Sequence, residues 1–325
     1  MEKSVKKMSS YNRQVRIFSR KFIHDFKKNS NFFTRFNYLA IGIFAFEFLA
    51  CIFSIKYFSE TSLIAFFLAV FLLTGFAYLI LFFYFNTKKP DYFEYLKDRF
   101  IRSCRSNLPI AQGQIEHHLS ICSAISFLVE DLKVLPGMKV FKKFSKEIAQ
   151  EDIFLLKEML LISSKQELLK QIKNTPVDIE LHVALANNYV NLSALYKDHK
   201  QSLSINTKKE KTLDKKYSIA IQRTIEEFQI LNDLSPNDPW VHAQLAKSYK
   251  ELGLLEKEKN EYENILNLRP DDLQVMFQCA VCYFKLGQNA KGLKAYETLK
   301  KSHFIRADEL LQFYGKENLK IEEEE

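Results

Sequence analysis

Two consecutive segments of 34 residues decide the fold of this chain, because the second repeats the first. Residues 236–269 read PNDPWVHAQLAKSYKELGLLEKEKNEYENILNLR, and residues 270–303 read PDDLQVMFQCAVCYFKLGQNAKGLKAYETLKKSH. A repeat of this length is typical of solenoids, in which each unit buries its apolar face against the next. The residues that recur unchanged at the offset of 34 include Pro236 and Pro270, Asp238 and Asp272, Ala246 and Ala280, Tyr249 and Tyr283, Leu252 and Leu286, Gly253 and Gly287, and Tyr262 and Tyr296.

The repeated positions resemble the tetratricopeptide repeat (TPR), in which two antiparallel helices pack through alternating small and large side chains. The small residue lets a neighbouring helix approach, the aromatic residue fills the space beside it, and glycine permits the turn. His242 and Met276 stand where the family usually carries tryptophan, and Glu258 stands where it usually carries alanine. The framework positions that fit are Leu245, Ala246, Tyr249, Gly253, Tyr262 and Pro270 in unit 237–270, and Ala280, Tyr283, Gly287 and Tyr296 in unit 271–304.

A third unit lies upstream, where Leu185, Ala186 and Tyr189 precede their counterparts by 60 residues, one period plus 26. The extra residues fall near 197–216, a lysine-rich stretch that either lengthens the helix pair or forms a mobile loop. The organisation expected for this part is a helical region at 110–175 that is a candidate degenerate repeat, repeats at 176–236, 237–270 and 271–304, and a capping helix with an acidic tail at 305–325.

Two apolar runs precede the repeats: residues 36–55 carry one charge, and residues 63–85 carry none. Each is long enough for a helix to cross a hydrocarbon core of ~30 Å. Seven residues join the runs, so we expect an antiparallel hairpin over 36–85. Eight glycines and seven prolines argue against β-rich folds and glycine-rich nucleotide-binding loops. The sequence therefore predicts an all-α chain, a transmembrane helical hairpin followed by a TPR-like α-solenoid.

The net charge of +8 lies in an N-terminal arm, residues 1–35, which holds ten basic residues against two acidic ones. The juxtamembrane linker after the second run, 86–109, is also net positive. The positive-inside rule then places both termini in the cytoplasm. We therefore expect a two-pass integral protein of the bacterial inner membrane. Its arm would contact anionic lipid headgroups, and no nucleic-acid partner is expected.

The arm also carries an apolar stripe. Val15, Phe18, Phe22 and Phe26 recur at three- and four-residue steps, with basic residues elsewhere on the wheel. This pattern resembles a basic amphipathic helix that lies in the headgroup region of a membrane. A disordered basic flank is the alternative.

Glu47 lies inside the first apolar run, where a carboxylate costs a few kcal/mol and usually faces a partner or a polar cavity. In an antiparallel hairpin the opposite level falls near 72–74, so Thr74 or Tyr78 could donate a hydrogen bond to a protonated Glu47. A homo-oligomer contact through the hairpin, or a protein partner, is another interpretation. A proton-linked role for Glu47 in a membrane enzyme is the least favoured one.

No catalytic constellation stands out, so we expect no enzyme, no catalytic residue, no cofactor and no bound metal. Cys279 and Cys282 fall in the first helix of a repeat, where small residues pack, and they lack a second pair for zinc. Adjacent histidines such as His117 and His118 point about 100° apart on a helix and cannot hold one metal together. The five cysteines are an odd number and indicate a reducing compartment.

The TPR resemblance implies a concave groove, lined by the first helix of each pair, that holds an extended peptide or a partner's helix. Transferring the groove positions of the family gives Asn187, Asn191, Gln244, Lys247, Lys250, Gln278 and Lys285. These donors suit carbonyls and carboxylates, and the set is similar to the carboxylate clamp of chaperone-docking repeat domains without matching it. Simple solvated helix faces are the alternative.

The expected function is a scaffold that recruits a protein partner to the cytoplasmic face, as the chain resembles bacterial membrane-anchored TPR proteins. Its close hydrophobic hairpin also resembles the inclusion-membrane proteins that intracellular bacteria secrete, which would display the repeats to host proteins instead.

Overall fold

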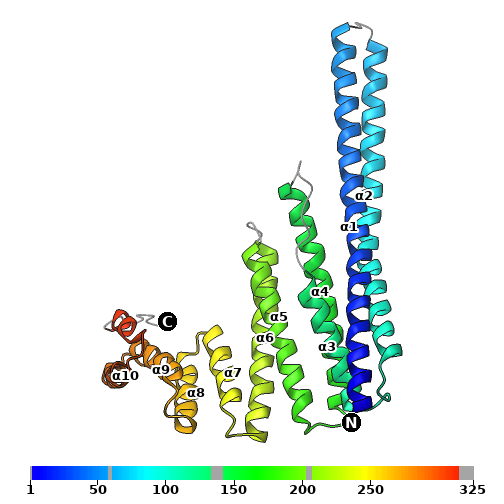
Figure 1. The fold of residues 1–325 in the computed structure, drawn as a ribbon. Helices are drawn as coiled ribbons and strands as arrows, with labels where there is room; N and C mark the ends of the chain where they lie inside the picture. Colours follow the sequence, from blue (N-terminus) through cyan, green and yellow to red (C-terminus); the bar gives the residue numbers. More distant parts are fainter. Residues whose placement is uncertain (1, 58–60, 133–141, 203–206, 315–325) are drawn as a thin grey trace. The chain divides into compact units, whose positions relative to one another are not determined.

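The computed structural model describes residues 2–57, 61–132, 142–202 and 207–314. Over these ranges the chain is all-α, with ten α-helices, one 3₁₀ helix and no strand (Figure 1). It divides into two compact units, Met1–Ser164 and Lys165–Glu325. The all-α class and the helix pairs expected from the repeats are therefore present.

The first unit is built on two long helices that run antiparallel, α1 (Glu2–Tyr57) and α2 (Thr61–Asn107). Two further helices, α3 (Ile115–Asp131) and the first part of α4 (Lys142–Ile172), pack against them. The predicted arm 1–35 is not a separate element, because from Glu2 it continues without a break into the first apolar run. The predicted linker is likewise helical as far as Asn107, with Pro90 inside the helix.

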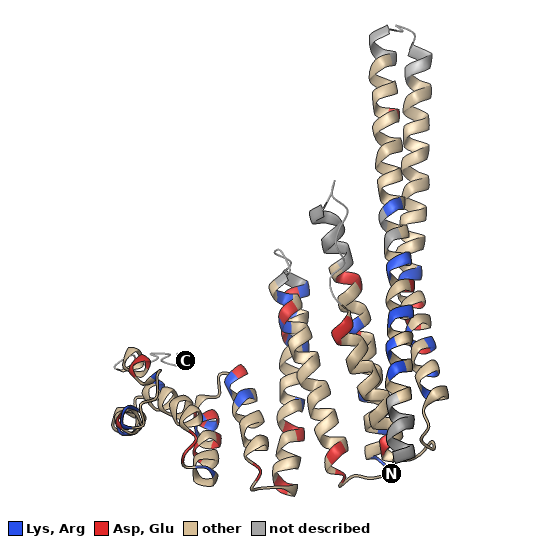
Figure 2. Ribbon diagram, in the orientation of Figure 1, with Lys and Arg blue, Asp and Glu red and all other residues tan. Residues whose placement is uncertain are grey.

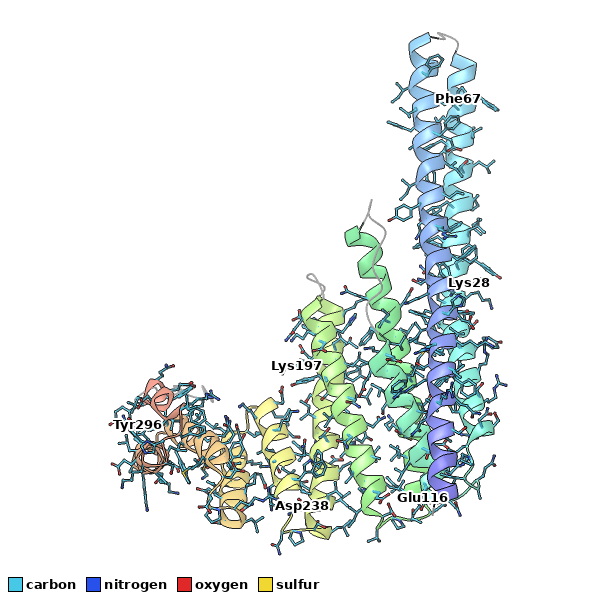
Figure 3. All side chains as sticks on the ribbon, viewed as in Figure 1. Lys28, Phe67, Glu116, Lys197, Asp238 and Tyr296 are labelled. Carbon is cyan, nitrogen blue, oxygen red and sulfur yellow. The ribbon has the colours of Figure 1, made fainter. Side chains whose placement is uncertain are left out.

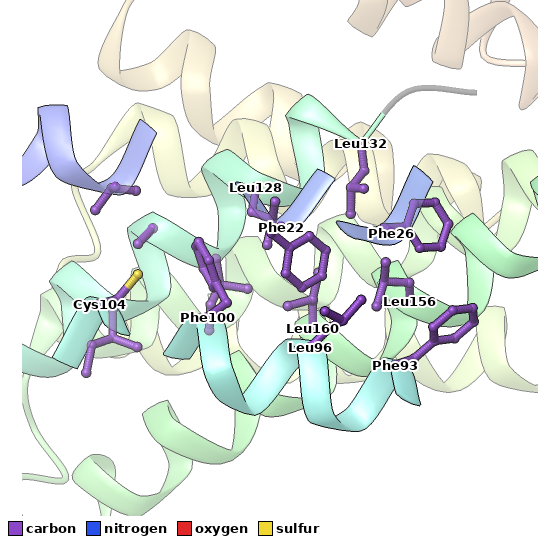
Figure 4. Packing of buried hydrophobic residues seen from close by; sticks show 14 of the residues in the cluster. Phe22, Phe26, Phe93, Leu96, Phe100, Cys104, Leu128, Leu132, Leu156 and Leu160 are labelled. Carbon is purple, nitrogen blue, oxygen red and sulfur yellow. The ribbon is translucent and has the colours of Figure 1, made fainter. Parts of the chain in front are cut away.

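The apolar stripe of the arm lies in a protein core, so the prediction that it faces lipid headgroups is wrong. Phe26 is only 1 % exposed, and Val15 and Phe22 are also buried. The Phe26 ring lies 5.6 Å from the Phe93 ring of α2, and the Phe22 ring lies 5.8 Å from that of Phe100. An amphipathic pattern predicts that one face of a helix is buried, but it does not say whether lipid or protein covers that face. In this structure other helices of the protein cover it (Figure 4).

Helices α3 and α4, from the predicted helical region 110–175, complete this core. Leu128 of α3 and Leu156 and Leu160 of α4 are fully buried in the cluster that contains the α1 stripe. Because these side chains pack against α1 and α2, α3 and the first part of α4 form a bundle with the long helices.

Polar contacts fasten the same bundle. Arg99 of α2 donates to Asp25 of α1 at 2.7 Å, and Lys89 of α2 lies 3.1 Å from Asp152 of α4. The Lys89 ammonium also lies 4.7 Å from the centre of the Phe33 ring. Both charges of the Lys89–Asp152 pair are largely buried, so removing one partner would leave an uncompensated charge.

Beyond the bundle, α1 and α2 continue as a bare hairpin with almost no charge (Figure 2). Both helices are long and apolar enough to cross a membrane by length and composition, and none of the most apolar 18-residue window of α2 is buried. Phe46 and Leu73 are 74 % and 70 % exposed. The two helices contact each other through aromatic side chains such as Phe44 and Phe71, whose rings lie 5.6 Å apart.

The second unit is a succession of helix pairs. The pairs are α5 (Ile179–Ser202) with α6 (Thr207–Leu234), α7 (Pro239–Glu251) with α8 (Leu255–Leu268), and α9 (Leu273–Lys285) with α10 (Asn289–Lys301), followed by the 3₁₀ helix η1 (Ala307–Phe313). Each pair corresponds to one predicted repeat. The insertion lengthens both helices of the first pair, to 24 and 28 residues against 13 and 14 in the second. The predicted cap is thus a 3₁₀ turn, and the acidic tail lies outside the described residues.

The repeated residues explain where these helices begin and turn. Asp178, Asp238 and Asp272 each accept a hydrogen bond from a backbone N–H of the first turn, at 2.9–3.0 Å, which caps the first helix of each pair. Gly253 and Gly287 both adopt φ +71°, a left-handed conformation that glycine reaches without strain. The short period therefore reproduces the same cap and the same turn.

A substitution in the α1 stripe tests whether protein or lipid covers it. Phe26→Ala removes a fully buried ring and should lower the melting temperature of the purified full-length chain by about 10 °C, from a loss of about 3–5 kcal/mol. The exposed neighbour serves as the matched control, because Lys27→Ala should leave the melting temperature within about 2 °C. Equal, small effects of the two variants would contradict the buried position of Phe26.

Candidate functional site

The predicted groove residues lie on the first helix of each pair: Asn187 and Asn191 on α5, Gln244, Lys247 and Lys250 on α7, and Gln278 and Lys285 on α9. The two asparagines and Lys247 and Lys250 are exposed, whereas the other three are half-buried. The helix pairs therefore carry a row of donors in contact with solvent.

Two of these residues meet across adjacent pairs. The Lys250 ammonium donates to the side-chain oxygen of Gln278 at 3.5 Å, which joins α7 to α9. Lys285 lies 5.9 Å from the centre of the Phe313 ring in the cap. The structure thus brings Lys250, Gln278 and Lys285 into one region and gives no comparable contact between the asparagines of α5.

A buried acid that sequence reasoning did not place in the site lies beneath these lysines. Glu258 of α8 is 5 % exposed. Burial raises the pKa of its carboxyl, and the charge of Lys250, a hydrogen bond to Cys282 and the charge of Lys285 oppose that shift. The sequence signal for this acid was that glutamate stands at position 258, where tetratricopeptide repeats usually carry alanine.

The insertion supplies a second polar contact at the end of α7. Lys197 of α5 and the hydroxyl of Tyr217 of α6 both donate to the same Oε2 of Glu251, at 2.5 and 2.7 Å (Lys197 is labelled in Figure 3). The hydrogen bond from Lys197 holds the pKa of Glu251 below its usual range. The lengthened first pair therefore braces the second, through residues too distant in sequence to be recognised as partners.

His182 and His242 occupy equivalent positions and make the same two contacts. In His182, Nδ1 lies 2.7 Å from the Glu227 carboxylate and Nε2 lies 2.9 Å from the Pro176 carbonyl. His242 contacts Glu261 at 2.7 Å and the Pro236 carbonyl at 3.0 Å. Each histidine therefore links the residues before the first helix of its pair to the second helix of that pair. A role in packing alone would not require these two polar contacts.

Both partners of His182 are hydrogen-bond acceptors, so this geometry favours the imidazolium, in which both nitrogens donate. Burial alone would lower the pKa of His182. The hydrogen bond to Glu227 and that to the Pro176 carbonyl outweigh burial, so the pKa is raised above its ordinary value.

The repeat framework is buried as the packing argument requires. Ala186, Ala246 and Ala280 are completely buried, and Leu185 and Leu245 nearly so. The framework tyrosines keep their hydroxyls hydrogen-bonded: Tyr249 accepts from Gln229 at 3.2 Å, Tyr283 donates to Glu263 at 2.7 Å, and Tyr296 donates to Asp308 at 2.9 Å. Tyr189 and Tyr262 are half-buried, Gly253, Gly287 and Pro270 are at turns, and Leu252 packs against the α5–α7 core.

Cys279 and Cys282 are buried in α9 with this framework. Burial raises the pKa of the Cys279 thiol to about 11 and raises that of Cys282 as well, so both stay protonated near neutral pH. Among the described residues, no group of three or more His, Cys, Asp and Glu side chains could hold a metal ion.

In the hairpin, Thr74 of α2 donates to Oε1 of Glu47 at 2.7 Å, whereas Tyr78 donates to Asn37 at 3.3 Å. Glu47 also lines a hollow of about 460 Å³ beside Gly42 and Phe67. Of the two donors expected for Glu47, the structure therefore brings only Thr74 to it.

No protein-family model matches the chain, and no curated protein matches it either. Among solved structures, MamA (MSR-1) is 12 % identical, with a TM-score of 0.32 over 69 % of this chain and 98 % of its own. TTC0263, a thermophilic TPR protein of Thermus thermophilus, is 14 % identical, with a TM-score of 0.32 over 61 % of this chain and 92 % of its own. TM-scores this low carry no argument about the fold. The solenoid-like arrangement rests on the helix pairs of the chain itself.

The His182 contacts predict a pH dependence of stability. Because the pKa of His182 is raised on folding, its stabilising contribution is complete below the ordinary pKa of about 6.5 and is lost as pH rises through the folded value. His182→Gln should therefore lower the melting temperature most near pH 6, and the difference from wild type should shrink as the pH is raised. The exposed His303 provides a control, since His303→Asn should show no such trend. A difference that grows with pH would contradict the prediction.

Proposed function

We propose that the chain is a membrane-anchored scaffold that recruits a protein partner to the cytoplasmic face of a membrane. The observation that carries the proposal is a bare apolar hairpin on the same chain as a solenoid-like row of helix pairs with exposed donors. The hairpin would be the anchor, and the groove residues of α5, α7 and α9 would be the binding surface.

The case for an anchor rests on exposed apolar surface. Side chains such as Phe46, Leu73, Phe76 and Phe83 lie on the outside of the hairpin. Burying apolar surface is worth about 25 cal/mol per Å², so leaving two such helices in water would be costly. Hydrocarbon removes this cost, and a helix can enter it because the backbone polar groups of its interior bond to one another. The basic residues beside the hairpin favour an orientation with both termini in the cytoplasm of a bacterial inner membrane.

The case for protein binding rests on the donors of the groove. Lys247, Lys250 and Gln278 can donate to backbone carbonyls or carboxylates of a partner, and helix pairs in a row offer them at regular intervals.

Protease accessibility tests the orientation. In sealed vesicles with the cytoplasmic side outward, protease should digest residues 165–325, because the proposed topology leaves them in the medium. In vesicles of the opposite orientation the same residues should be protected. Protection in the first preparation would overturn the proposed topology.

Charge reversal tests the groove. Lys247→Glu/Lys250→Glu should weaken binding of the partner by about tenfold or more, because it replaces two donors with acceptors and adds repulsion. The control Lys294→Glu/Lys301→Glu changes two exposed lysines of α10 by the same charge. Affinity capture with the full-length chain should lose a protein with the first variant and keep it with the second. An identical set of captured proteins would contradict the groove.

A further inference from the structure

The first half of α1 carries a second exposed surface, on the side opposite its buried stripe. Arg13, Arg16 and Arg20 lie there within two turns, and Ile17 stands among them with 55 % of its surface exposed. We call these four residues the arginine face. Further along the same helix, the exposed Lys27, Lys28 and Arg35 approach the apolar hairpin; Lys28 is labelled in Figure 3.

The charges of this helix differ from those of its neighbour. On α2, Lys89, Lys97 and Arg99 each have a carboxylate within 4 Å. Within the described ranges, none of the three arginines of the arginine face has an ion-pair partner, and neither does Lys27, Lys28 or Arg35. Lys89 and Arg99 of α2 are thus paired with carboxylates of other helices, whereas these cations of α1 stay available to another molecule.

Lipid headgroups cannot contact all of the basic residues of α1 from Arg13 to Arg35. Since α1 is one continuous helix with a rise of 1.5 Å per residue, Arg13 lies about 33 Å along the axis from Arg35. Salt screens charges over about 8 Å under physiological conditions. If the hairpin crosses a membrane as proposed above, headgroups reach Arg35 and approach Lys27 and Lys28, while the arginine face stands in the cytoplasm.

An apolar groove adjoins the arginine face. It lies between α1 and α3, has a volume of about 570 Å³, and is lined by Val15, Leu119 and Phe127 among others. Arg16 forms part of its edge, with its guanidinium 5.9 Å from the centre of the Phe127 ring. Around α1 the arginines therefore lie between this groove and the exposed Ile17.

We propose that the arginine face docks an acidic amphipathic helix of a partner protein, distinct from the ligand of the solenoid groove. Carboxylates spaced at i, i+3 and i+7 would match Arg13, Arg16 and Arg20, each of which can bind a carboxylate through two parallel hydrogen bonds. The apolar side of the docked helix would cover Ile17, which lies on the side of the arginines that faces away from the groove. The orientation toward the cytoplasm rests on the proposed function, whereas the docking chemistry does not.

A protein partner fits this surface better than a nucleic acid does. An exposed isoleucine beside the arginines contributes to an interface with apolar side chains and gives a phosphate backbone nothing to bind. The acidic Glu116 also lies on the edge of the groove, where a continuous line of phosphates would be repelled.

The test uses the full-length chain in nanodiscs of zwitterionic lipid and a fluorescent helical peptide with glutamates at i, i+3 and i+7 and leucines beside them. Anisotropy measures its affinity for wild type and for two triple variants of equal charge change, Arg13→Glu/Arg16→Glu/Arg20→Glu and Lys27→Glu/Lys28→Glu/Arg35→Glu. The first should weaken binding by about tenfold or more, and the second by less than about threefold. Ile17→Ser should weaken it severalfold without changing its salt dependence.

Three outcomes would overturn the proposal: equal losses in the two triple variants, tighter binding of a DNA duplex or of anionic vesicles than of the peptide at the arginine face, or no effect of Ile17→Ser. The Lys247→Glu/Lys250→Glu chain separates this result from the groove, because it should bind the peptide as wild type does. Loss of binding in that variant would assign the peptide to the solenoid instead.

Discussion

Burial of the α1 stripe against α2, α3 and α4 is the constraint on which the arrangement of the first unit depends. Phe22 and Phe26 pack on Phe100 and Phe93, outside the apolar hairpin. Because both long helices are continuous, this contact fixes the direction in which the hairpin leaves the bundle. The same contact determines which side chains of α1 are exposed, because a helix with one side in a protein core presents its other side to solvent.

The parts of the fold that were predictable from sequence are those encoded locally. A 34-residue period, the aspartate caps and the two glycine turns recur at fixed offsets, so the helix pairs and their boundaries follow from a single repeat. The Glu47–Thr74 hydrogen bond belongs to the same class, because a short connector sets the register of an antiparallel hairpin. In each case the partners are close in sequence or related by the period.

The parts that were not predictable depend on partners far apart in the chain. The stripe of Val15 and Phe26 has the same periodicity whether lipid or protein covers it, and the protein that covers it comes from residues 93–160. Lys197 and Glu251 are 54 positions apart, so nothing in either local sequence marks the pair. The His182–Glu227 contact spans 45 positions for a similar reason: the insertion displaces the glutamate from the offset it has in the next repeat.

The net charge of the chain is a further property whose meaning depends on partners distant in sequence. As a number, +8 is compatible with a flank of a membrane, and the sequence favours that interpretation. In the structure Lys89 and Arg99 of α2 are paired with carboxylates of other helices, and Arg13, Arg16 and Arg20 of α1 have no such partner among the described residues. The positive-inside rule counts Lys and Arg within about 15–20 residues of a spanning segment, a range that contains Lys27, Lys28 and Arg35. Arg13, Arg16 and Arg20 lie at or beyond the far limit of that range, next to the exposed Ile17, where we propose that a partner helix docks.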